Sequence, residues 1–421
     1  MHVPDRWKKT KLSNLSEKRI SNGAFNDPKK VGSGYRLINV VNLYTPRHIN
    51  IEALTLLELT DKEFINFQVK KNDLFFTRSS LKLEGIAHCN IFDKEDDNVV
   101  YECHIMRVRP IYAKVNAKYL LEYCQSHVAR KHFMSHAKTG TMTTIDQSGV
   151  GNLDVLLPPL PEQQKIAQIL STWDKAIEKL EALIAAKQKR KKALMQQLLT
   201  GKKRFAGFEG DWEEYKLGEI TDKRKKWSFT GGPFGSNLKA QDYTESGVRI
   251  IQLQNIGDGL FHDNYKIYTS TKKADELLSC NIYPGEIIIS KMGDPVARAC
   301  FIPNSSDRFL MASDGIRLAV DEEKFNKKFI HDYINHKIFR KKAISASTGS
   351  TRQRIGLDDL RKLTLLVPTL SEQQKIASVL SAADKEIETH QSQLYALKQQ
   401  KKGLMQQLLT GKKRVKLEKA A

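Results

Sequence analysis

The sequence predicts an α+β fold in which two mixed α/β domains are joined by two long helices that form a coiled coil, with an antiparallel arrangement expected. The first observation is a repeat: residues 162–204 recur as residues 372–414, with 26 of 43 positions identical and no gap. The second is that the residues before each copy mix short β-rich runs with helical stretches, and resemble one another only faintly. A chain built this way is expected to be one unit duplicated, with a pseudo-twofold relation between its halves.

Four segments follow from this pattern. Residues 1–157 are expected to form a first variable domain and residues 158–204 a central repeated helix. Residues 205–367 are expected to form a second variable domain, and residues 368–421 a distal repeated helix.

The variable domains share one short motif. Residues 34–42 and 247–255 both read G-x-R-[LI]-I-[NQ]-[VL]-x-N. Runs rich in β-branched and aromatic residues between turns predict strands at 35–43, 72–77, 105–108, 249–253, 286–291 and 315–320. Residues 118–135 and 327–346 are expected to be helical.

The repeated segments have the pattern of long helices. Apolar residues follow a 4-3 spacing from Ile166 to Leu198 and from Ile376 to Leu408. Pro161 suits a helix start, and Ser371 with Gln374 predicts a capping box at the second start. A glycine follows the last apolar residue of each copy, so both helices are expected to end there, after roughly 38 residues and 57 Å.

Several seam positions are polar, namely Lys187, Lys191, His390 and Lys401. Two explanations stay open. The polar residues can fix an antiparallel register, or the seams can be incomplete and finished by a helix from a partner.

The charge indicates a polyanionic partner. Lysine and arginine outnumber the acidic residues by 69 to 48, a net charge of +21. Residues 187–204 carry eight basic residues and residues 398–416 carry seven, with no acidic residue in either run. Basic runs late in a helix also complement its dipole, but their recurrence in both halves favours nucleic acid.

No feature predicts secretion, a membrane span or a metal. The first residues lack the apolar core of a signal peptide and no apolar run approaches about 18 residues, so we expect a cytoplasmic protein. The five cysteines form no CxxC pair and the histidines no zinc spacing, which predicts free thiols, mostly buried. The acidic cluster at 93–97 has turn composition and is expected to be a solvated loop.

Catalytic motifs are absent. No glycine run matches G-x-G-x-x-G, and neither Gly-Lys pair is followed by the serine or threonine of a P-loop. The single Pro-Pro pair follows Leu157, so the N-P-P-[FY] of an amino-methyltransferase is missing. We therefore expect a chain that is not catalytic by itself and holds no cofactor.

Polar clusters between the expected strands are the candidate nucleic-acid contacts. Arginine, asparagine and glutamine can bond base edges, whereas serine, threonine and lysine more often hold phosphate. In the first domain the candidates are Arg36, Asn39, Asn42, Arg78, Ser79, Lys82, Lys138 and Thr139. In the second they are Ser236, Asn237, Lys239, Arg249, Gln252, Asn255, Lys291, Arg298, Thr351, Arg352 and Gln353. For the motif residues Arg36, Asn42, Arg249 and Asn255, a role in shaping the fold explains the recurrence equally well.

The order of variable domain, repeated helix, variable domain and repeated helix resembles the specificity subunit of a type I restriction-modification system. The resemblance covers the whole chain. It is carried by L-[PS]-E-Q-Q-K-I-A at 160–167 and 370–377, by L-L-T-G-K-K-R closing both helices and, less specifically, by Gly-Pro-Phe-Gly-Ser at 232–236, which is similar to part of that family's target recognition domains.

The resemblance implies a function. Such a subunit reads a bipartite target in double-stranded DNA and holds two copies of a methyltransferase subunit against it, and restriction (translocase-nuclease) subunits join the complex. S-adenosylmethionine, ATP and Mg²⁺ would then bind to the partner subunits. The basic residues at 187–190 become Leu-Lys-Gln-Gln at 397–400, so the two partner-facing surfaces need not be equivalent.

The helix residues expected to bind the partner are Glu162, Gln163, Gln164, Ile166, Trp173, Glu372, Gln373, Gln374, Ile376 and Leu380. Two other functions stay open. One is an enzyme with an unrecognised active site in a variable domain, and the other is a coiled-coil adaptor that does not touch nucleic acid.

Overall fold

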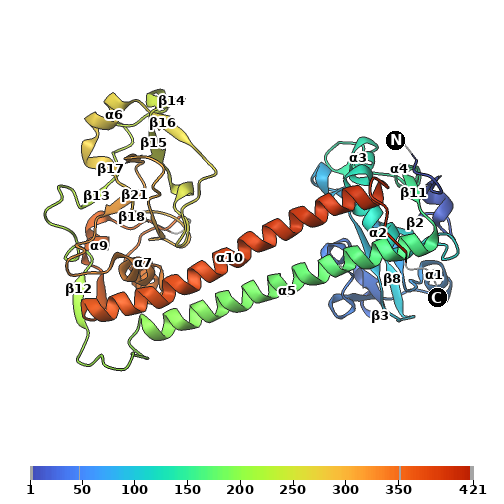
Figure 1. Cartoon of the computed structure of the whole chain (residues 1–421), viewed down its shortest axis with the longest axis horizontal. Helices are drawn as coiled ribbons and strands as arrows, with labels where there is room; N and C mark the ends of the chain where they lie inside the picture. Colours follow the sequence, from blue (N-terminus) through green and yellow to red (C-terminus); the bar gives the residue numbers. More distant parts are fainter. Residues whose placement is uncertain (1–2, 47, 350–351, 418–421) are drawn as a thin grey trace. The chain divides into compact units, whose positions relative to one another are not determined.

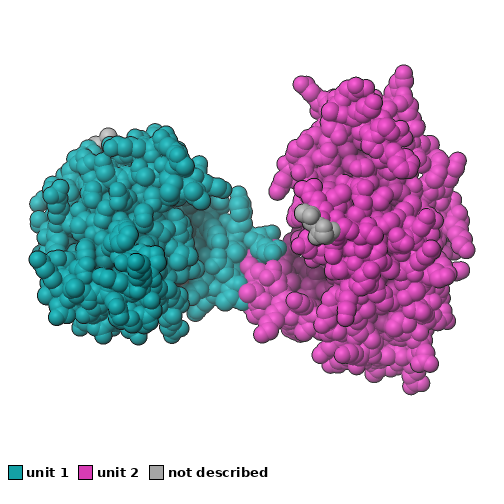
Figure 2. All heavy atoms as spheres, turned by 180° about the vertical axis from the view of Figure 1, so that it is seen from behind, with its two compact units in different colours: residues 1–182, 391–421 teal, residues 183–390 magenta. Residues whose placement is uncertain are grey.

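The computed structural model describes residues 3–46, 48–349 and 352–417. The chain divides into two compact units (Figure 2). Unit 1 contains residues 1–182 and 391–421, and unit 2 contains residues 183–390. The predicted α+β class, with two long helices, is confirmed (Figure 1).

Unit 1 is built from small sheets and short helices. Its main sheet has the order β2-β9-β5-β7, and a second sheet has the order β4-β3-β8. Two further pairs, β1-β11 and β10-β6, complete the strands of this unit. The strand bounds are β1 Lys8–Lys11, β2 Ser21–Asn22, β3 Val31–Ile38, β4 Thr55–Leu57, β5 Asp73–Thr77, β6 Ser79–Ser80, β7 Cys89–Phe92, β8 Val99–Tyr101, β9 Ile105–Val108, β10 Thr143–Thr144 and β11 Asp154–Leu157.

The helices of unit 1 follow and interrupt these strands. The α-helices are α1 Asp61–Phe67, α2 Ala117–Gln125, α3 His127–Ser135 and α4 Gln147–Gly151. The 3-10 helices are η1 Leu12–Leu15, η2 Pro28–Lys30, η3 Val40–Tyr44, η4 Ile51–Ala53 and η5 Leu83–Gly85.

Unit 2 repeats the same plan. The sheet β13-β21-β18-β19 corresponds in order to β2-β9-β5-β7, and the sheet β14-β16-β15-β20-β17 contains the counterpart of β4-β3-β8. The strand bounds are β12 Glu213–Lys216, β13 Phe229–Gly231, β14 Tyr243–Thr244, β15 Val248–Ile251, β16 Ile267–Thr269, β17 Asn281–Ile282, β18 Ile287–Ser290, β19 Ala299–Phe301, β20 Phe309–Met311, β21 Gly315–Leu318 and β22 Thr364–Val367. β22 pairs with β12 as β11 pairs with β1.

The shorter helices of unit 2 are α6 Thr271–Glu276, α7 Lys327–Asn335, α8 Lys337–Ser345 and α9 Leu357–Lys362, with 3-10 helices η6 Ala240–Asp242, η7 Leu253–Asn255 and η8 Leu278–Cys280. After the main sheet, α7, α8 and α9 follow one another as α2, α3 and α4 do in unit 1. The helices expected at 118–135 and 327–346 are each two helices. Ser126 and His336 are extended, and each caps the next helix with its own side chain.

The two long helices, α5 Leu160–Leu198 and α10 Leu370–Leu409, each contribute to both units. In unit 1, Lys398 lies opposite Glu181 and Lys401 opposite Asp174, so α10 runs against α5. Unit 2 pairs Lys187 with Glu386 and Lys191 with Asp384 in the same sense. The antiparallel prediction is therefore confirmed within each unit, and the seam residues Lys187, Lys191 and Lys401 have acidic partners that fix the register.

The ends of the helices belong to the domain cores. Ile166 and Leu170 of α5 pack in one cluster with Leu408 and Leu409 of α10, together with β-strand residues of unit 1. Both helices end as predicted, with Gly201 and Gly411 at φ of 68° and 69°. The capping box expected at Ser371 is wrong, because α10 begins earlier, at Leu370.

Candidate nucleic-acid interface

In each domain the shared motif ends a strand and starts a 3-10 turn. Asn39 is the N-cap of η3 and Gln252 the N-cap of η7. The backbone N–H of Asn39 donates to Asn42 Oδ1 at 2.8 Å, and that of Gln252 donates to Asn255 Oδ1 at 2.9 Å. These caps stop the strands, so the strands expected at 35–43 and 249–253 end earlier than predicted, at Ile38 and Ile251.

The two motif asparagines hold the turn rather than face solvent. Asn255 is 1% exposed, and its Nδ2 donates to the carbonyls of His262 and Tyr265 at 2.9 and 3.0 Å. Asn42 is buried too, and its Nδ2 donates to the carbonyl of Ala53. We therefore correct the candidate set by removing Asn42 and Asn255, whose hydrogen-bonding atoms are already used.

The two motif arginines differ in environment. Arg249 is buried, forms an ion pair with Asp263 and lies over the ring of Phe261 at 5.2 Å. It therefore fastens a loop of its own domain and is also removed from the candidate set. The Arg36 side chain is 48% exposed and pairs with Asp96, so it remains accessible.

Arg78 and Lys291 occupy matching places at the ends of β5 and β18. The backbone N–H of Arg78 donates to the carbonyl of His104, and that of Lys291 to the carbonyl of Asp314. The Arg78 side chain is exposed and the Lys291 side chain half-buried. Each strand end therefore presents one basic side chain.

A turn follows beside each of these strand ends. Lys138 bridges to Thr144 in unit 1, and Thr348 bridges to Arg354 in unit 2. The first turn presents Lys138 and Thr139, both exposed, and lies next to Ser79, which is half-buried, because β10 pairs with β6. Lys82 follows β6 and is exposed. In the second turn Arg352 is exposed and Gln353 half-buried, whereas Thr351 lies outside the described residues.

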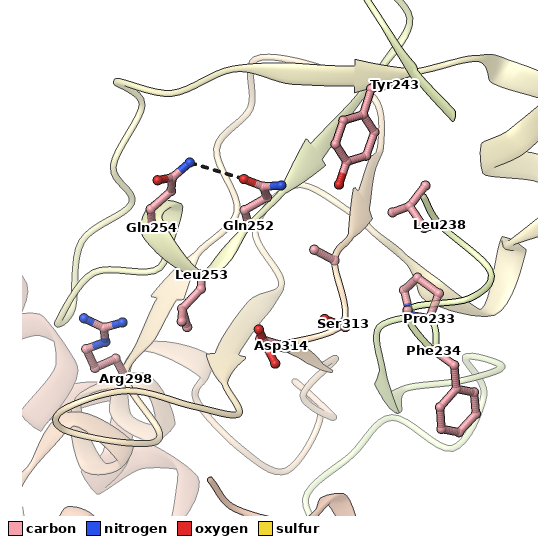
Figure 3. Close-up of a pocket in the computed structure, with 12 residues that line it drawn as sticks. Pro233, Phe234, Leu238, Tyr243, Gln252, Leu253, Gln254, Arg298, Ser313 and Asp314 are labelled. Carbon is pink, nitrogen blue, oxygen red and sulfur yellow. Dashed lines mark hydrogen bonds between the residues drawn. The ribbon is translucent and has the colours of Figure 1, made fainter. Parts of the chain in front are cut away.

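An open pocket of about 510 Å³ brings several candidates of the second domain together (Figure 3). Gln252 lies on its wall, and Gln254 Nε2 donates to Gln252 Oε1 at 3.2 Å. Arg298 also lines it, and its buried Nε has no hydrogen-bond partner among the described residues. Asp314, another lining residue, accepts a hydrogen bond from the Arg354 guanidinium at 2.6 Å.

The exposed loop 234–239 borders this pocket and carries three further candidates, Ser236, Asn237 and Lys239. The pocket thus gathers amide, guanidinium and hydroxyl groups from four segments of the chain. Such groups bond base edges and phosphates.

The predicted partner-binding residues mostly fasten each helix to its own unit. Gln163 accepts from the Asn116 backbone N–H at 2.9 Å and donates to the Pro158 carbonyl at 2.8 Å. Gln373 repeats both bonds with Asn326 and Pro368, each at 2.8 Å.

Buried glutamates form a second fastening. The Glu162 carboxylate accepts hydrogen bonds from Nε and Nη2 of Arg414, at 2.6 and 2.7 Å. The Glu372 carboxylate accepts hydrogen bonds from the same atoms of Arg204, at 3.0 and 2.7 Å. We call each pair a helix clamp, because it ties the start of one long helix to the residues just beyond the end of the other. The Trp7 ring covers the Arg414 guanidinium at 5.6 Å.

These contacts correct part of the partner-binding prediction. Seven of its residues are buried within their own unit and are not available to a partner: Glu162, Gln163, Ile166, Glu372, Gln373, Ile376 and Leu380. The exposed Gln164 and Gln374 and the half-buried Trp173 remain candidates.

A buried carboxylate lies beside the helix pair in each unit. In unit 1, Lys401 Nζ is 3.2 Å from Glu122 and 2.8 Å from Asp174, so one ammonium serves two carboxylates. Burial, outweighing the attraction of Lys401, raises the pKa of Glu122 to about 7. Sequence reasoning missed this group.

The matching carboxylate of unit 2 behaves differently. Asp332 lies between Lys328 and His331, and Lys191 is close to the neighbouring Asp384. Burial opposes ionisation of Asp332, but the His331 hydrogen bond and the Lys328 charge together lower its pKa. The His331 hydrogen bond, which Leu121 at the matching position of unit 1 cannot make, and the Lys328 charge therefore make the difference between the units.

The described part of the chain holds no cluster of three metal-ligating side chains, and none of its helices is long and apolar enough to cross a membrane. All five cysteines are free thiols, and Cys103 alone among them is only half-buried.

Comparison with known proteins identifies the family. The family model of the type I restriction modification DNA specificity domain matches residues 4–188 and again residues 209–399. The specificity subunit of the type I restriction enzyme MjaVIII of Methanocaldococcus jannaschii is 27% identical over 68% of this chain and 68% of its own. A predicted specificity subunit of the same organism, that of the enzyme MjaX, is 24% identical over 98% of this chain and 95% of its own.

Solved structures share the fold. A chain from a study of the assembly and conformational transition of a type I restriction-modification system superposes with a TM-score of 0.61 at 16% identity, covering 97% of this chain and 99% of that one. The specificity subunit of the type I system of M. genitalium gives 0.57 at 16% identity, covering 97% and 98%. Since the family model covers both halves, this chain belongs to the type I restriction-modification specificity subunits and carries two copies of their DNA specificity domain.

Proposed function

We propose that this chain reads a DNA target made of two different half-sites, one for each domain, separated by a spacer of unspecified sequence. The observation that carries the proposal is the pair of units with one plan and different candidate loops. Arg36 is exposed, whereas its counterpart Arg249 is buried. The loop 234–239 of the second domain also carries different polar residues from the matching stretch 25–30 of the first. Domains that differ in this way are expected to read different sequences, so the target is asymmetric.

The proposal includes a scaffold role. Two methyltransferase subunits are held by the helix pair, where Gln164, Gln374 and Trp173 are the accessible candidates. Restriction subunits join through the assembled complex, and S-adenosylmethionine, ATP and Mg²⁺ bind to those partners. The chain itself supplies recognition and no catalysis, and works in the cytoplasm.

The test is to express the chain with its methyltransferase subunit and to read the methylated motif in the DNA of those cells. We expect two unlike half-sites separated by a fixed number of unspecified bases. A continuous or palindromic motif contradicts the proposal.

Two rival functions give different results. Methylation or cleavage of DNA by the purified chain alone would support an enzyme. Weak DNA binding with little dependence on salt would support an adaptor, because several phosphate contacts make affinity fall by roughly 10³-fold or more between 50 and 200 mM salt.

A further inference from the structure

An exposed phenylalanine occupies the same place in both domains. Phe25 is 74% exposed and Phe234 is 83% exposed. In the matching sheets, Ser21 of β2 lies opposite Arg107 and Thr230 of β13 lies opposite Arg317. Each phenylalanine comes four residues after that paired position. The rest of these two stretches differs, so the ring is a shared feature of otherwise divergent loops.

A glycine fixes the path of the chain toward each ring. A Cβ atom on Gly23 would lie 1.9 Å from the carbonyl oxygen of Tyr101, and one on Gly232 would lie 1.9 Å from that of Ala312. Only glycine can pass so close to a carbonyl without a shift of the backbone. The carbonyl of each phenylalanine then closes a turn, accepting from Asp27 N–H or Asn237 N–H at 3.1 or 2.8 Å. The rings are therefore presented by built turns.

Each ring stands beside an amide suited to a base edge. Phe234 lines the pocket that contains Gln252, and Figure 3 shows its ring directed away from the other lining side chains. In the first domain, Asn26, next to Phe25, donates from Nδ2 to Oδ1 of Asn39, the counterpart of Gln252, at 3.3 Å.

A single exposed apolar side chain needs no explanation. Here two exposed rings recur at one position, on turns held by obligatory glycines and beside amides. In a chain of charge +21, they indicate a binding partner that has a planar, apolar surface with negative charge nearby. Nucleic-acid bases offer that surface, and a projecting aromatic ring can stack on a base or wedge between base steps.

We propose that Phe25 and Phe234 stack on bases of the DNA, one ring in each half-site, and unstack a base step there. This rests on the proposed function. The side chains are exposed, so truncating them leaves the fold intact and removes only the contact.

The experiment uses the assembled complex with the methyltransferase subunit and a duplex carrying the motif read from cellular DNA. Phe25→Ala and Phe234→Ala should each weaken binding by roughly 5- to 150-fold, since base–aromatic stacking contributes about 1–3 kcal/mol per base. Phe234→Tyr should retain most of the affinity and Phe234→Leu should not. Leu366→Ala, at an exposed apolar residue of β22, is the control and should bind normally.

A fluorescent base assigns each ring to a half-site. With 2-aminopurine placed at successive positions, the wild-type complex should change the fluorescence at one step in each half-site. Phe25→Ala should abolish the change in one half-site only, and Phe234→Ala in the other.

Several results would overturn the inference while leaving the proposed function in place. These are variants that bind as well as the wild type, an unchanged fluorescence pattern, or an equal loss for Phe234→Tyr and Phe234→Leu. Failure of the variants to co-purify with the methyltransferase would make the rings a protein contact instead. If the wild-type complex itself does not bind the duplex, the proposed function fails first.

Discussion

At the scale of single residues, the absence of a Cβ atom at Gly23 and Gly232 sets the path of the backbone next to each exposed ring. Gly232→Ala places a Cβ atom against the backbone of Ala312, which cannot move as a side chain can. We expect a loss of unfolding free energy of roughly 1–3 kcal/mol, as for other overpacked sites. Gly235→Ala, three residues later with no atom within 4 Å of its Cβ, should melt like the wild type. Equal melting temperatures for the two variants would show that the turn can shift without cost.

Glu122 predicts a dependence of stability on pH. Its folded pKa of about 7 lies above its ordinary value of 4.5, so the folded state keeps a proton that the unfolded state releases. Stability from this site is therefore present below about pH 4.5 and falls as the pH rises to about 7. Glu122→Gln removes the titration, and its stability relative to the wild type should improve by roughly 1–3 kcal/mol across that range.

The control for this prediction is the matching residue of unit 2. The pKa of Asp332 is lowered, so its contribution is present above its ordinary pKa of 3.8 and is lost as the pH falls below that value. Asp332→Asn should therefore lose stability at neutral pH. Urea unfolding of both variants and the wild type at several pH values measures how each free energy of unfolding depends on pH. A difference between Glu122→Gln and the wild type that does not change with pH would contradict the raised pKa of Glu122.

At the scale of elements, the helix clamps hold the ends of the long helices. Arg204→Met leaves the fully buried carboxylate of Glu372 without its bidentate partner. Removing the partner of a buried carboxylate is destabilising, so we expect a lower melting temperature. The double variant Arg204→Met with Glu372→Gln should recover most of that loss, and Lys203→Met, at an exposed neighbour, should have little effect. Thermal melting of the wild type, Arg204→Met, Glu372→Gln and the double variant forms a double-mutant cycle. Additive losses would show that the two side chains do not act together.

The elements could be predicted to different extents from the sequence. The long helices follow from periodicity and the terminal glycines, which act locally. The breaks at Ser126 and His336 were missed, because apolar positions continue through them while a side-chain cap turns the backbone. The ends of the strands in the shared motif were predicted too late for the same reason, since Asn42 and Asn255 cap the turn from three residues away.

The candidate site was harder to predict than the fold. Exposed lysines and serines on turns follow from composition. The burial of Arg249 does not, because its partners Asp263 and Phe261 lie on a loop whose position no local pattern fixes. The exposed Phe25 and Phe234 run against the expectation that aromatic rings are buried. Their signal was the recurring Gly-x-Phe at 23–25 and 232–234.

At the scale of the whole molecule, the long helices pass from one unit to the other at residues 182–183 and 390–391. Inserting one heptad at each of these places keeps both seams in register and adds about 10.5 Å. If the helix pair sets the spacing of the half-sites, the spacer should grow by about 3 base pairs with the half-sites unchanged. Methylation motifs of the variant measure this. Binding should also weaken, because about 3 additional base pairs rotate one half-site relative to the other by roughly 100°. An unchanged spacer at full activity would show that the helices do not set the distance between the half-sites.

The composition of unit 1 governs how the protein can be made. Its core includes Leu408 and Leu409, and its clamp requires Arg414, yet all of unit 2 lies between these residues and the rest of unit 1. At about 5–20 residues per second, a ribosome needs roughly 10–40 s to synthesise that interval. For that time the nascent first domain exposes an uncovered helix face and an unpaired Glu162. A chain that ends before Leu408 therefore lacks the part of the first domain's core and clamp that α10 and Arg414 supply.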